Sequence, residues 1–437
     1  MESHTMLKQL QQREQQRSLA RQLHRIKGNT KKGLNELQVL EDGQWVTVTD
    51  KTAIEQECMI EGKKRFVQAS GTACLSPDQI ELLGWTANTK TSDSLLQGSI
   101  PIALHADIIK NIASYLQQTT SVTNRPPIES IMIEDQYVSG WAKAKKRTSS
   151  GTSGLHFGHF KANSTMQQTL DVDLKLLQMS IMLGYSLVRW RSAVDVMIPK
   201  KADSKKAEQL RVICLMEPDF NFMNKWMGKI TMANAEAANS IAPEQFGSRK
   251  NKSAIQHAFN KALCFDTLRT MKEDSALTVL DAKSCYDRIP PPLACLCLRR
   301  QGLPQNIIDA SFNSIKDMTH HIRTAYGILE VSYERDNDSY MHGILQGNGA
   351  GPCIWVMLSI PILDMLSDQG NGATLNLPDG QIIKVVAFAF VDDIDLIQKL
   401  PTDNPLVALQ HDFNIWEQGL QTISGALVWE KCDVYIL

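Results

Sequence analysis

Two apolar stretches of this chain each run directly into aspartate. Residues 277–280 are Leu, Thr, Val and Leu, a run of strand-forming side chains that leads into Asp281. Residues 385–397 read VVAFAFVDDIDLI, with apolar side chains on both sides of Asp392 and Asp393. The first pattern predicts a buried strand with an acid at its end. The second predicts a strand–turn–strand hairpin with two acids at its tip.

Turn signals and apolar periodicity predict further elements around these two stretches. These elements are a turn and short strand at residues 41–50, a capped helix at 49–66, a helix with prolines at its start at 290–304 and a hairpin at 321–333. A Pro-Asp-Gly turn precedes the strand that reaches Asp392. Helices that alternate with hairpins in this way indicate an α+β fold.

Composition adds little except at one end of the chain. The length of 437 residues is enough for two or three domains, the 43% of hydrophobic residues allows a sizeable core, and the formal net charge is −1. Residues 1–33 differ, because they hold eight lysine or arginine residues against two glutamates. This stretch predicts a basic helical arm that lies along a phosphate backbone, although a solvated helix fits the same pattern.

The cysteines and the N-terminus indicate where the protein works. Nine scattered cysteines with no Cys-x-x-Cys pair are typical of reduced, buried thiols. The N-terminus is charged and shows no signal peptide, and no uninterrupted apolar stretch is long enough to cross a membrane. We therefore expect an intracellular protein, nuclear or cytoplasmic, with no membrane partner. His156 and His159 lack further ligands nearby, so they do not predict a zinc site.

The three strand-end acids indicate metal chemistry if the fold brings them together. Asp281 and Asp392 are 111 residues apart, so they can meet only through tertiary structure. Carboxylates are the ligands that hard divalent cations prefer, and a pair of such cations suits phosphoryl transfer. Two other interpretations stay open: Asp281 caps a helix, and Asp392 with Asp393 forms a solvated turn.

Six short motifs in the second half of the chain support the metal interpretation. They are a basic residue after Ile-Pro and an Arg-x-Ile in residues 197–221, the segment 243–258, an Asp followed five residues later by a Tyr at 281–286, a Gln-Gly followed by a Pro at 346–352, the FVDD at 390–393, and a Gly followed by Lys431. In this order they resemble the motifs of reverse transcriptases (RNA-directed DNA polymerases) of the kind carried by non-LTR retroelements and group II introns.

The resemblance implies a role for each matching residue. Asp281, Asp392 and Asp393 would hold two Mg²⁺ ions, with Mn²⁺ as an alternative cation, and the metal-binding acids would be catalytic together with Lys431 as a general acid for pyrophosphate. Lys200 and Arg211 would contact the nucleotide triphosphate, Tyr286 would exclude a 2′-hydroxyl, and Gln346 and Gly347 would lie beside the nucleotide. From the residues alone, solvated lysines, a core tyrosine and an ordinary glycine loop remain open.

The resemblance also implies a right-hand polymerase fold, with fingers and a palm whose antiparallel sheet packs on helices. We expect a basic helical extension at residues 1–33, a mixed region at 34–135, fingers and pre-palm at 136–273, and a palm at 274–437. Lys431 lies six residues before the end of the sequence. We therefore expect the thumb, which follows the palm in this family, to be missing and the palm to be truncated after the Lys431 segment.

The expected function is template-directed DNA synthesis on a primed RNA or DNA template with dNTPs, impaired if the thumb is missing. Tyr286 and Val391 stand where viral RNA-dependent RNA polymerases carry an acid and a glycine, which favours DNA synthesis. Two alternatives remain: an inactive nucleic-acid-binding remnant, and an RNA-synthesising palm polymerase. The chain also departs from the family pattern, because Val212 replaces a usual proline and the Gln-Gly segment lacks its usual Ser-Pro.

Overall fold

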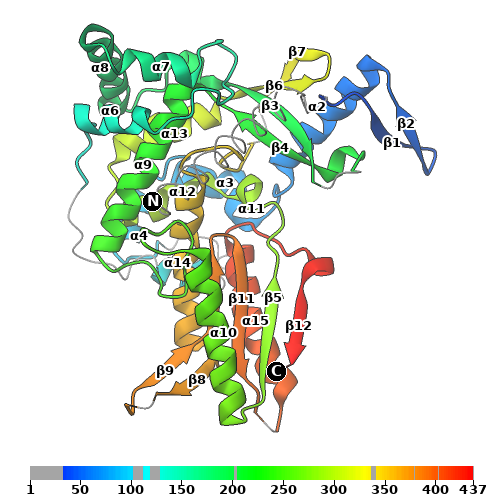
Figure 1. Cartoon of the computed structure of the whole chain (residues 1–437), viewed down its shortest axis with the longest axis vertical. Coiled ribbons are helices and arrows are strands. Elements are labelled where there is room, and N and C mark those ends of the chain that lie inside the picture. The colour runs from blue at the N-terminus through cyan, green and yellow to red at the C-terminus, as the bar shows by residue number, and fades with distance from the viewer. Residues whose placement is uncertain are drawn as a thin grey trace, which may run out of the picture.

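The structure is a computed structural model that describes residues 33–101, 112–118, 128–200, 204–335, 341–377, 379–401 and 403–436. The basic arm expected at residues 1–33 lies outside the described residues except for Gly33. Helices and strands alternate along the described chain, and their layout is shown in Figure 1. The α+β composition predicted from the sequence is therefore present.

The first half of the chain is mainly helical, with one strand pair at its start and another before its last helix. Its elements are β1 (Leu37–Glu41), β2 (Gln44–Val48), α2 (Lys51–Val67), α3 (Pro77–Leu83), α4 (Lys90–Leu96), α6 (Glu134–Ala142), α7 (Phe157–Asn163), α8 (Gln167–Leu183), β3 (Ser192–Pro199), β4 (Leu210–Leu215) and α9 (Pro218–Ala237). The side chain of Asp50 accepts a hydrogen bond from Ala53 N at 2.9 Å and so caps α2. The capped helix predicted at residues 49–66 is confirmed.

The second half contains most of the strands. Its elements are α10 (Ala254–Met271), β5 (Ser275–Leu280), α11 (Cys285–Arg288), α12 (Pro291–Arg300), α13 (Gln305–Lys316), β6 (Thr319–Thr324), β7 (Gly327–Tyr333), α14 (Gly351–Gln369), β8 (Ala373–Asn376), β9 (Ile382–Val385), β10 (Ala387–Phe390), β11 (Asp393–Lys399), α15 (Pro405–Thr422) and β12 (Asp433–Ile436). Three predictions are confirmed here: the strand before Asp281, the hairpin around the aspartate pair, and the hairpin that turns near Gly327.

Two four-stranded sheets organise the molecule. The upper sheet of Figure 1 has the strand order β4-β3-β6-β7, in which β3 and β6 run parallel, and α2 packs against β6 and β7. The lower sheet has the order β10-β11-β5-β12 and is antiparallel throughout. Strands β6 and β7 belong to the range expected to form the palm, yet they pair with β3 from the range expected to form the fingers. The division into fingers and palm therefore stays a proposal.

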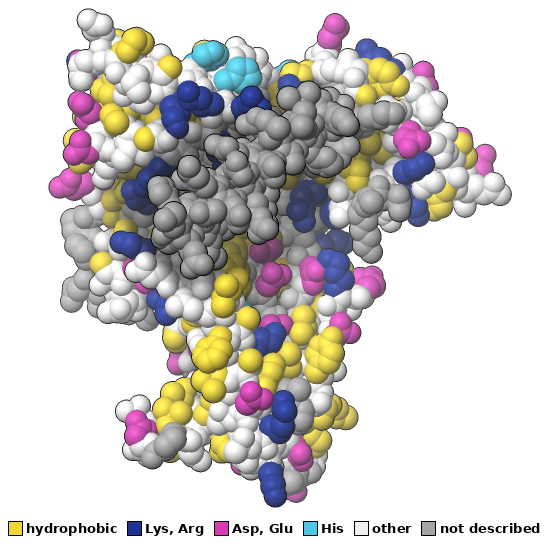
Figure 2. Space-filling view, viewed as in Figure 1, with side chains coloured by type: hydrophobic (Ala, Val, Ile, Leu, Met, Phe, Trp, Pro, Cys, Tyr) yellow, Lys and Arg dark blue, Asp and Glu magenta, His cyan; other side chains and the backbone are white. Residues whose placement is uncertain are grey.

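Helix α14 supplies much of the core between the two sheets. It is 19 residues long, and its length and apolar composition would suit a membrane span. However, 78% of its apolar stretch is buried inside the fold. It packs against α9, α12 and α15, as a core helix of a globular domain does. In Figure 2 hydrophobic side chains also gather on the surface over α10 and β12, where residues such as Phe259 and Tyr435 are exposed.

Candidate active site

The lower sheet brings the three strand-end acids together. Strand β5 pairs with β11 so that Leu280 lies opposite Ile394, and Asp281 and Asp393 each adjoin this pair in sequence. Asp392 precedes Asp393 in the turn between β10 and β11. Opposite residues of an antiparallel pair have neighbouring side chains. The fold thus brings together acids that are distant in sequence.

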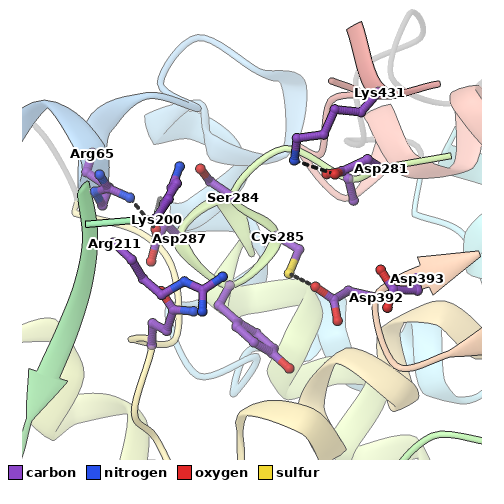
Figure 3. Close-up of a pocket in the computed structure, with 13 residues that line it drawn as sticks. Arg65, Lys200, Arg211, Asp281, Ser284, Cys285, Asp287, Asp392, Asp393 and Lys431 are labelled. Atoms are coloured by element: carbon purple, nitrogen blue, oxygen red, sulfur yellow. Dashed lines mark hydrogen bonds and ion pairs between the residues drawn. The ribbon is translucent and has the colours of Figure 1, made fainter. Parts of the chain in front are cut away.

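These acids line a cavity of about 260 Å³ in the middle of the molecule. The cavity is lined by Arg65, Lys200, Arg211, Asp281, Ala282, Ser284, Cys285, Tyr286, Asp287, Gln346, Asp392, Asp393 and Lys431. Figure 3 shows three acids on one side of this space and three cations, Arg65, Lys200 and Arg211, on the other. One wall can therefore bind a cation, and the opposite wall can bind an anion.

The electrostatics of the acidic wall favour a bound cation. The pKa of Asp393 is raised above its ordinary value by burial and then by the negative charges of Asp392 and Asp281. Lys431 partly offsets this repulsion, since its Nζ lies 2.5 Å from Asp281 Oδ2. Oxygen ligands alone fit Mg²⁺ or Mn²⁺ better than a metal that prefers nitrogen or sulfur. The donor set therefore fits the cation that the motifs implied.

The turn that carries the aspartate pair is held by residues from two other segments. Val391 has a φ of 60°, an uncommon conformation for a β-branched residue. The side chain of buried Gln245 accepts from Val391 N at 2.8 Å and donates to Val391 O at 3.2 Å, and Trp355 Nε1 donates to the same carbonyl at 2.7 Å. Gly247 lies so close that an added Cβ would be 2.2 Å from Val391 N. The segment 243–258 therefore supports the turn.

The opposite wall carries the two cations predicted for triphosphate binding. Lys200 and Arg211 lie at the same end of the β3–β4 pair, where Ile198 is opposite Arg211, and both are exposed. Partial burial and the neighbouring charges of Arg65 and Lys431 lower the pKa of Lys200. A cluster of cations that repel one another gains stability when an anion binds between them. This wall is suited to phosphate.

Tyr286 also lines the cavity, in a half-buried position, and its pKa is raised by burial and then by Cys285 and Asp392. Its backbone carbonyl accepts from Ile344 N at 2.9 Å, and Gly351 lies near the ring, where an added Cβ would be 3.7 Å from Cε1. The ring therefore lies in the same cavity as the three acids and has Gly351 as a neighbour.

The two residues of the Gln-Gly motif have different surroundings. Gln346 lines the cavity, and its carbonyl accepts from Cys214 N at 2.7 Å. Gly347 does not line the cavity. It has a φ of 124°, and an added Cβ would be 2.4 Å from the Cys214 carbonyl oxygen. The close backbone approach expected of this glycine is therefore made to strand β4 of the same chain.

Sequence reasoning missed three residues with ionisable side chains at this site. Arg65 of α2, Asp287 and Cys285 all line the cavity, and Cys285 Sγ lies 3.3 Å from Asp392 Oδ2. The positions of Cys285 and Asp287 next to Tyr286 offered a signal for both. Arg65 comes from a helix 135 residues before the first matching motif residue, Lys200, and nothing in its local sequence distinguishes it from other surface arginines.

A second buried polar group lies in the upper sheet and stays apart from this cavity. Asp195, Cys214 and His320 place one possible ligand atom each within 4.8 Å of one another. Asp195 Oδ2 lies 3.0 Å from His320 Nδ1 and also accepts from the hydroxyl of Tyr333. Each strand of the sheet contributes one member to this network, which explains it as a hydrogen-bonded link between strands.

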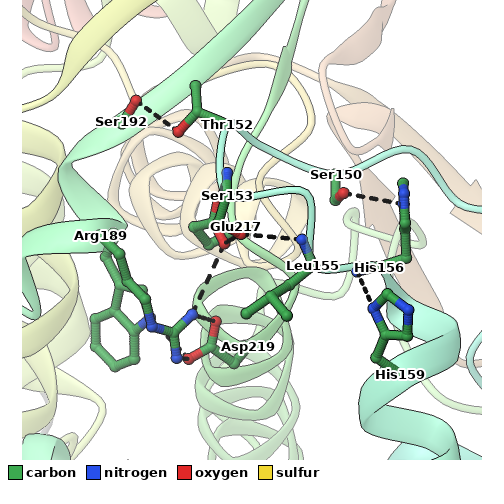
Figure 4. Close-up of polar contacts among 11 residues, drawn as sticks. Ser150, Thr152, Ser153, Leu155, His156, His159, Arg189, Ser192, Glu217 and Asp219 are labelled. Carbon is green, nitrogen blue, oxygen red and sulfur yellow. Dashed lines mark hydrogen bonds and ion pairs between the residues drawn. The ribbon is translucent and has the colours of Figure 1, made fainter.

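The Ser/Gly-rich loop before α7 is held by Glu217, the buried acid that precedes α9, as Figure 4 shows. Ser153 N and Oγ donate to the two carboxylate oxygens of buried Glu217, at 3.1 and 2.5 Å. Arg189 pairs with the same glutamate and with Asp219. His156 caps its own helix by donating N–H to His159 Nδ1 at 3.0 Å. The two histidines therefore take part in the local fold.

A larger basic groove of about 830 Å³ lies beside the cavity. Its lining includes the cations Lys143, Lys225, Lys229, Arg249 and Lys250 and the acid Glu236. Arg249 and Glu236 form an ion pair at 2.8 Å, which leaves the four lysines in excess over acids in the lining. Gly349 lines this groove three residues after Gln346, which lines the cavity, so the segment that begins with the Gln-Gly motif reaches both.

Comparison with known proteins agrees with this arrangement. The family model described as "Reverse transcriptase (RNA-dependent DNA polymerase)" matches residues 198–436, which is more than half of the chain and includes all three acids. The chain therefore belongs to the reverse transcriptase family. It is also similar to the "Retrovirus-related Pol polyprotein from type-1 retrotransposable element R2" of Popillia japonica, with 21% identity over 239 residues. The match covers 53% of this chain and 31% of that relative.

Proposed function

We propose that this chain catalyses template-directed DNA synthesis by nucleotidyl transfer at the cavity around Asp281, Asp392 and Asp393. The observation that carries the proposal is the convergence of these acids on one wall, opposite the cations of β3 and β4. When bound, two Mg²⁺ ions would lower the pKa of a primer 3′-hydroxyl and stabilise the leaving pyrophosphate. The three carboxylates, with the carbonyl of Ala282 as a further oxygen, would hold them.

The remaining cavity residues would bind and orient the substrates. Lys200 and Arg211 would contact the triphosphate of the incoming dNTP, and Arg211 would do so through its planar guanidinium. Tyr286 would lie beneath the sugar and exclude a 2′-hydroxyl by steric clash. Lys431 would leave Asp281 when the carboxylate binds a cation, and its freed ammonium could then donate a proton to pyrophosphate.

The basic groove would hold the template. Four lysines at the wall next to the Gln-Gly turn suit the phosphate backbone of a single strand that leaves the cavity. A reverse transcriptase domain implies a template, a primer and nucleotides. By its similarity to the R2 polyprotein, we propose that the chain comes from a non-LTR retroelement and that RNA is its natural template.

Primer extension on an RNA template tests the proposal. The wild-type chain should extend the primer with dNTPs and Mg²⁺, whereas Asp392→Asn and Asp281→Asn should each lose at least about a hundredfold in rate, because each removes a charged metal ligand. Asp266→Asn is the control, since this acid is an exposed residue of α10 that pairs only with Arg269.

Equal, background-level incorporation by the wild type and Asp392→Asn would defeat the enzymatic function. If both proteins still bound the primed template under those conditions, the inactive nucleic-acid-binding remnant would be the better description. Incorporation of ribonucleotides in preference to dNTPs would instead favour the RNA-synthesising alternative.

A further inference from the structure

One residue of the cavity lining comes from outside the region that matches the family model. Arg65 belongs to α2 and lies 133 residues before the match begins at residue 198. It lines the cavity with Lys200 and Arg211, although only 10% of its side chain is exposed. A largely buried guanidinium must have local partners, because an unpaired buried charge is strongly destabilising.

The two partners of Arg65 are each adjacent in sequence to a proposed nucleotide-binding residue. Its Nη2 donates to the carbonyl of Leu210 at 2.9 Å, and Leu210 precedes Arg211. Its Nη1 lies 3.5 Å from Oδ2 of Asp287, and Asp287 follows Tyr286. Figure 3 shows this guanidinium directed toward Asp287 at the edge of the cavity. One side chain thus bridges the wall that carries Lys200 and Arg211, here called the triphosphate wall, and residues 285–288, here called the tyrosine turn.

The rest of the contact between α2 and the tyrosine turn makes this bridge rigid. Arg288 Nη1 reaches back to the carbonyl of Gln68 at 3.4 Å, just beyond the end of α2. His342 N donates to the Phe66 carbonyl at 3.0 Å. Gly343, the next residue, lies so close to the turn that an added Cβ would be 2.8 Å from the Tyr286 carbonyl oxygen. The tyrosine turn is therefore confined between α2 and the segment that begins at His342.

We infer that Arg65 is a positioning residue that sets the distance between Arg211 and Tyr286, and thereby the selection of deoxynucleotides over ribonucleotides. The inference rests on the proposed function of the cavity. A steric filter works only if the triphosphate and the sugar-contacting ring are held at a fixed separation, since a shift of about 1 Å opens room for a hydroxyl. We place Arg65 beside the substrate site and not in contact with the substrate, because its Nη1 and Nη2 groups are directed to Asp287 and Leu210.

Single-nucleotide incorporation by the full chain tests this role through the ratio of kcat/KM for dNTP to that for rNTP. Arg65→Gln should lower the ratio at least about tenfold. The reference for a complete loss of the steric filter is Tyr286→Ala, and the ratio of Arg65→Gln should move toward its value. Arg299→Gln is the matched control, because Arg299 likewise donates to a backbone carbonyl, Ala87, and to an aspartate, Asp93, and lies outside the cavity lining. Its ratio should equal that of the wild type.

Two results of this assay would overturn the inference. A direct phosphate contact predicts that Arg65→Gln raises KM equally for both nucleotides and leaves the ratio unchanged. A purely stabilising ion pair predicts that Arg65→Gln/Asp287→Asn, which removes both charges, regains the wild-type ratio. The positioning role predicts that it does not, because Leu210 is still unbridged.

Hydrogen exchange on the same proteins tests whether Arg65 bridges the two segments, and it does not require catalysis. Arg65→Gln should increase exchange in residues 285–288 and 210–215 at least about threefold, whereas Arg299→Gln should leave both segments unchanged. Unchanged exchange in Arg65→Gln would overturn the bridge even if the wild type proved inactive. Absence of wild-type incorporation together with the expected exchange would count against the proposed function alone.

Discussion

Asp287 is the most buried of the four carboxyl groups that line the cavity, with 4% of the residue exposed. Burial raises its pKa from 3.8 to about 6, and the nearby Arg65 limits the rise. Because the folded-state pKa lies above the unfolded value, the carboxyl stabilises the fold below about pH 4. This contribution is lost as the pH rises through about 6, since the buried group must then ionise.

This shift gives a testable pH dependence of stability. Between pH 4 and pH 7.5 the loss at Asp287 is roughly 3 kcal/mol, from about two pKa units at 1.36 kcal/mol each. Asp287→Asn cannot ionise, so its unfolding free energy relative to the wild type should rise by about this amount over the interval. Urea denaturation at the two pH values measures it. A difference between the two proteins that stays constant with pH would contradict the assignment.

Residues of the site differ in how well their role can be predicted from the local sequence. Asp281, Asp392 and Asp393 could be predicted because an apolar strand leads into each acid, and such a pattern exposes a charge at a strand end. Tyr286 is predicted only by the resemblance to the reverse transcriptase motif, in which an aromatic residue follows the aspartate by five positions. Arg65 could not be found in this way, since its role comes from contacts with Leu210 and Asp287, which are 145 and 222 residues away.

The β10–β11 hairpin carries two of the three acids of the proposed metal site. Its strands were predictable, but its supports were not, because Gln245 and Trp355 hold the turn from segments far away in sequence. The partners of the hairpin were also not evident. The pairing of β11 with β5, of β12 with the opposite edge of β5, and of β6 with β3 all depend on long-range packing.

Gly247→Ala should disturb this hairpin selectively. The new Cβ would meet the backbone nitrogen of Val391 at 2.2 Å, so the turn that carries Asp392 must shift. We expect a loss of roughly 1–3 kcal/mol in stability from overpacking, and a Mg²⁺ requirement for primer extension that rises severalfold. A Mg²⁺ titration of the extension rate, together with a thermal melt, measures both effects.

The control for this substitution is Gly158→Ala on α7. That glycine has ordinary space around it, with the nearest atom 3.5 Å from an added Cβ, and alanine favours helix over glycine. It should therefore leave the Mg²⁺ requirement unchanged. If Gly247→Ala shows the wild-type Mg²⁺ titration, the turn does not set the metal site.

At the scale of the whole molecule, affinity for nucleic acid must come from local clusters of charge, because the formal net charge of the chain is −1. The groove next to the cavity is such a cluster, in which α9 presents Lys225 and Lys229 one turn apart while Lys143 and Lys250 come from other segments. The sequence predicted basic contacts with a nucleic-acid backbone only at residues 1–33. The groove was not predictable, since its lysines converge only in the folded chain.

The groove predicts how binding responds to salt. Each phosphate contact with a single strand contributes roughly 0.7 to the slope of log K against log salt concentration, because a bound lysine releases condensed counterions. Lys225→Gln/Lys229→Gln should therefore bind a labelled single-stranded RNA more weakly and with a slope shallower by roughly 1.4. Fluorescence anisotropy across a salt series gives both quantities without requiring catalysis.

The comparison that isolates the groove uses Lys175→Gln/Lys272→Gln, which removes the same charge from exposed positions outside both linings. If binding followed only total charge, the two double variants would weaken alike. If the groove holds the strand, only the first changes the slope, because distant charges alter the long-range attraction without releasing counterions at a contact. A slope equal to that of the wild type in Lys225→Gln/Lys229→Gln would show that the template binds elsewhere. It would not contradict the proposed metal site at Asp281, Asp392 and Asp393, because this measurement requires no catalysis.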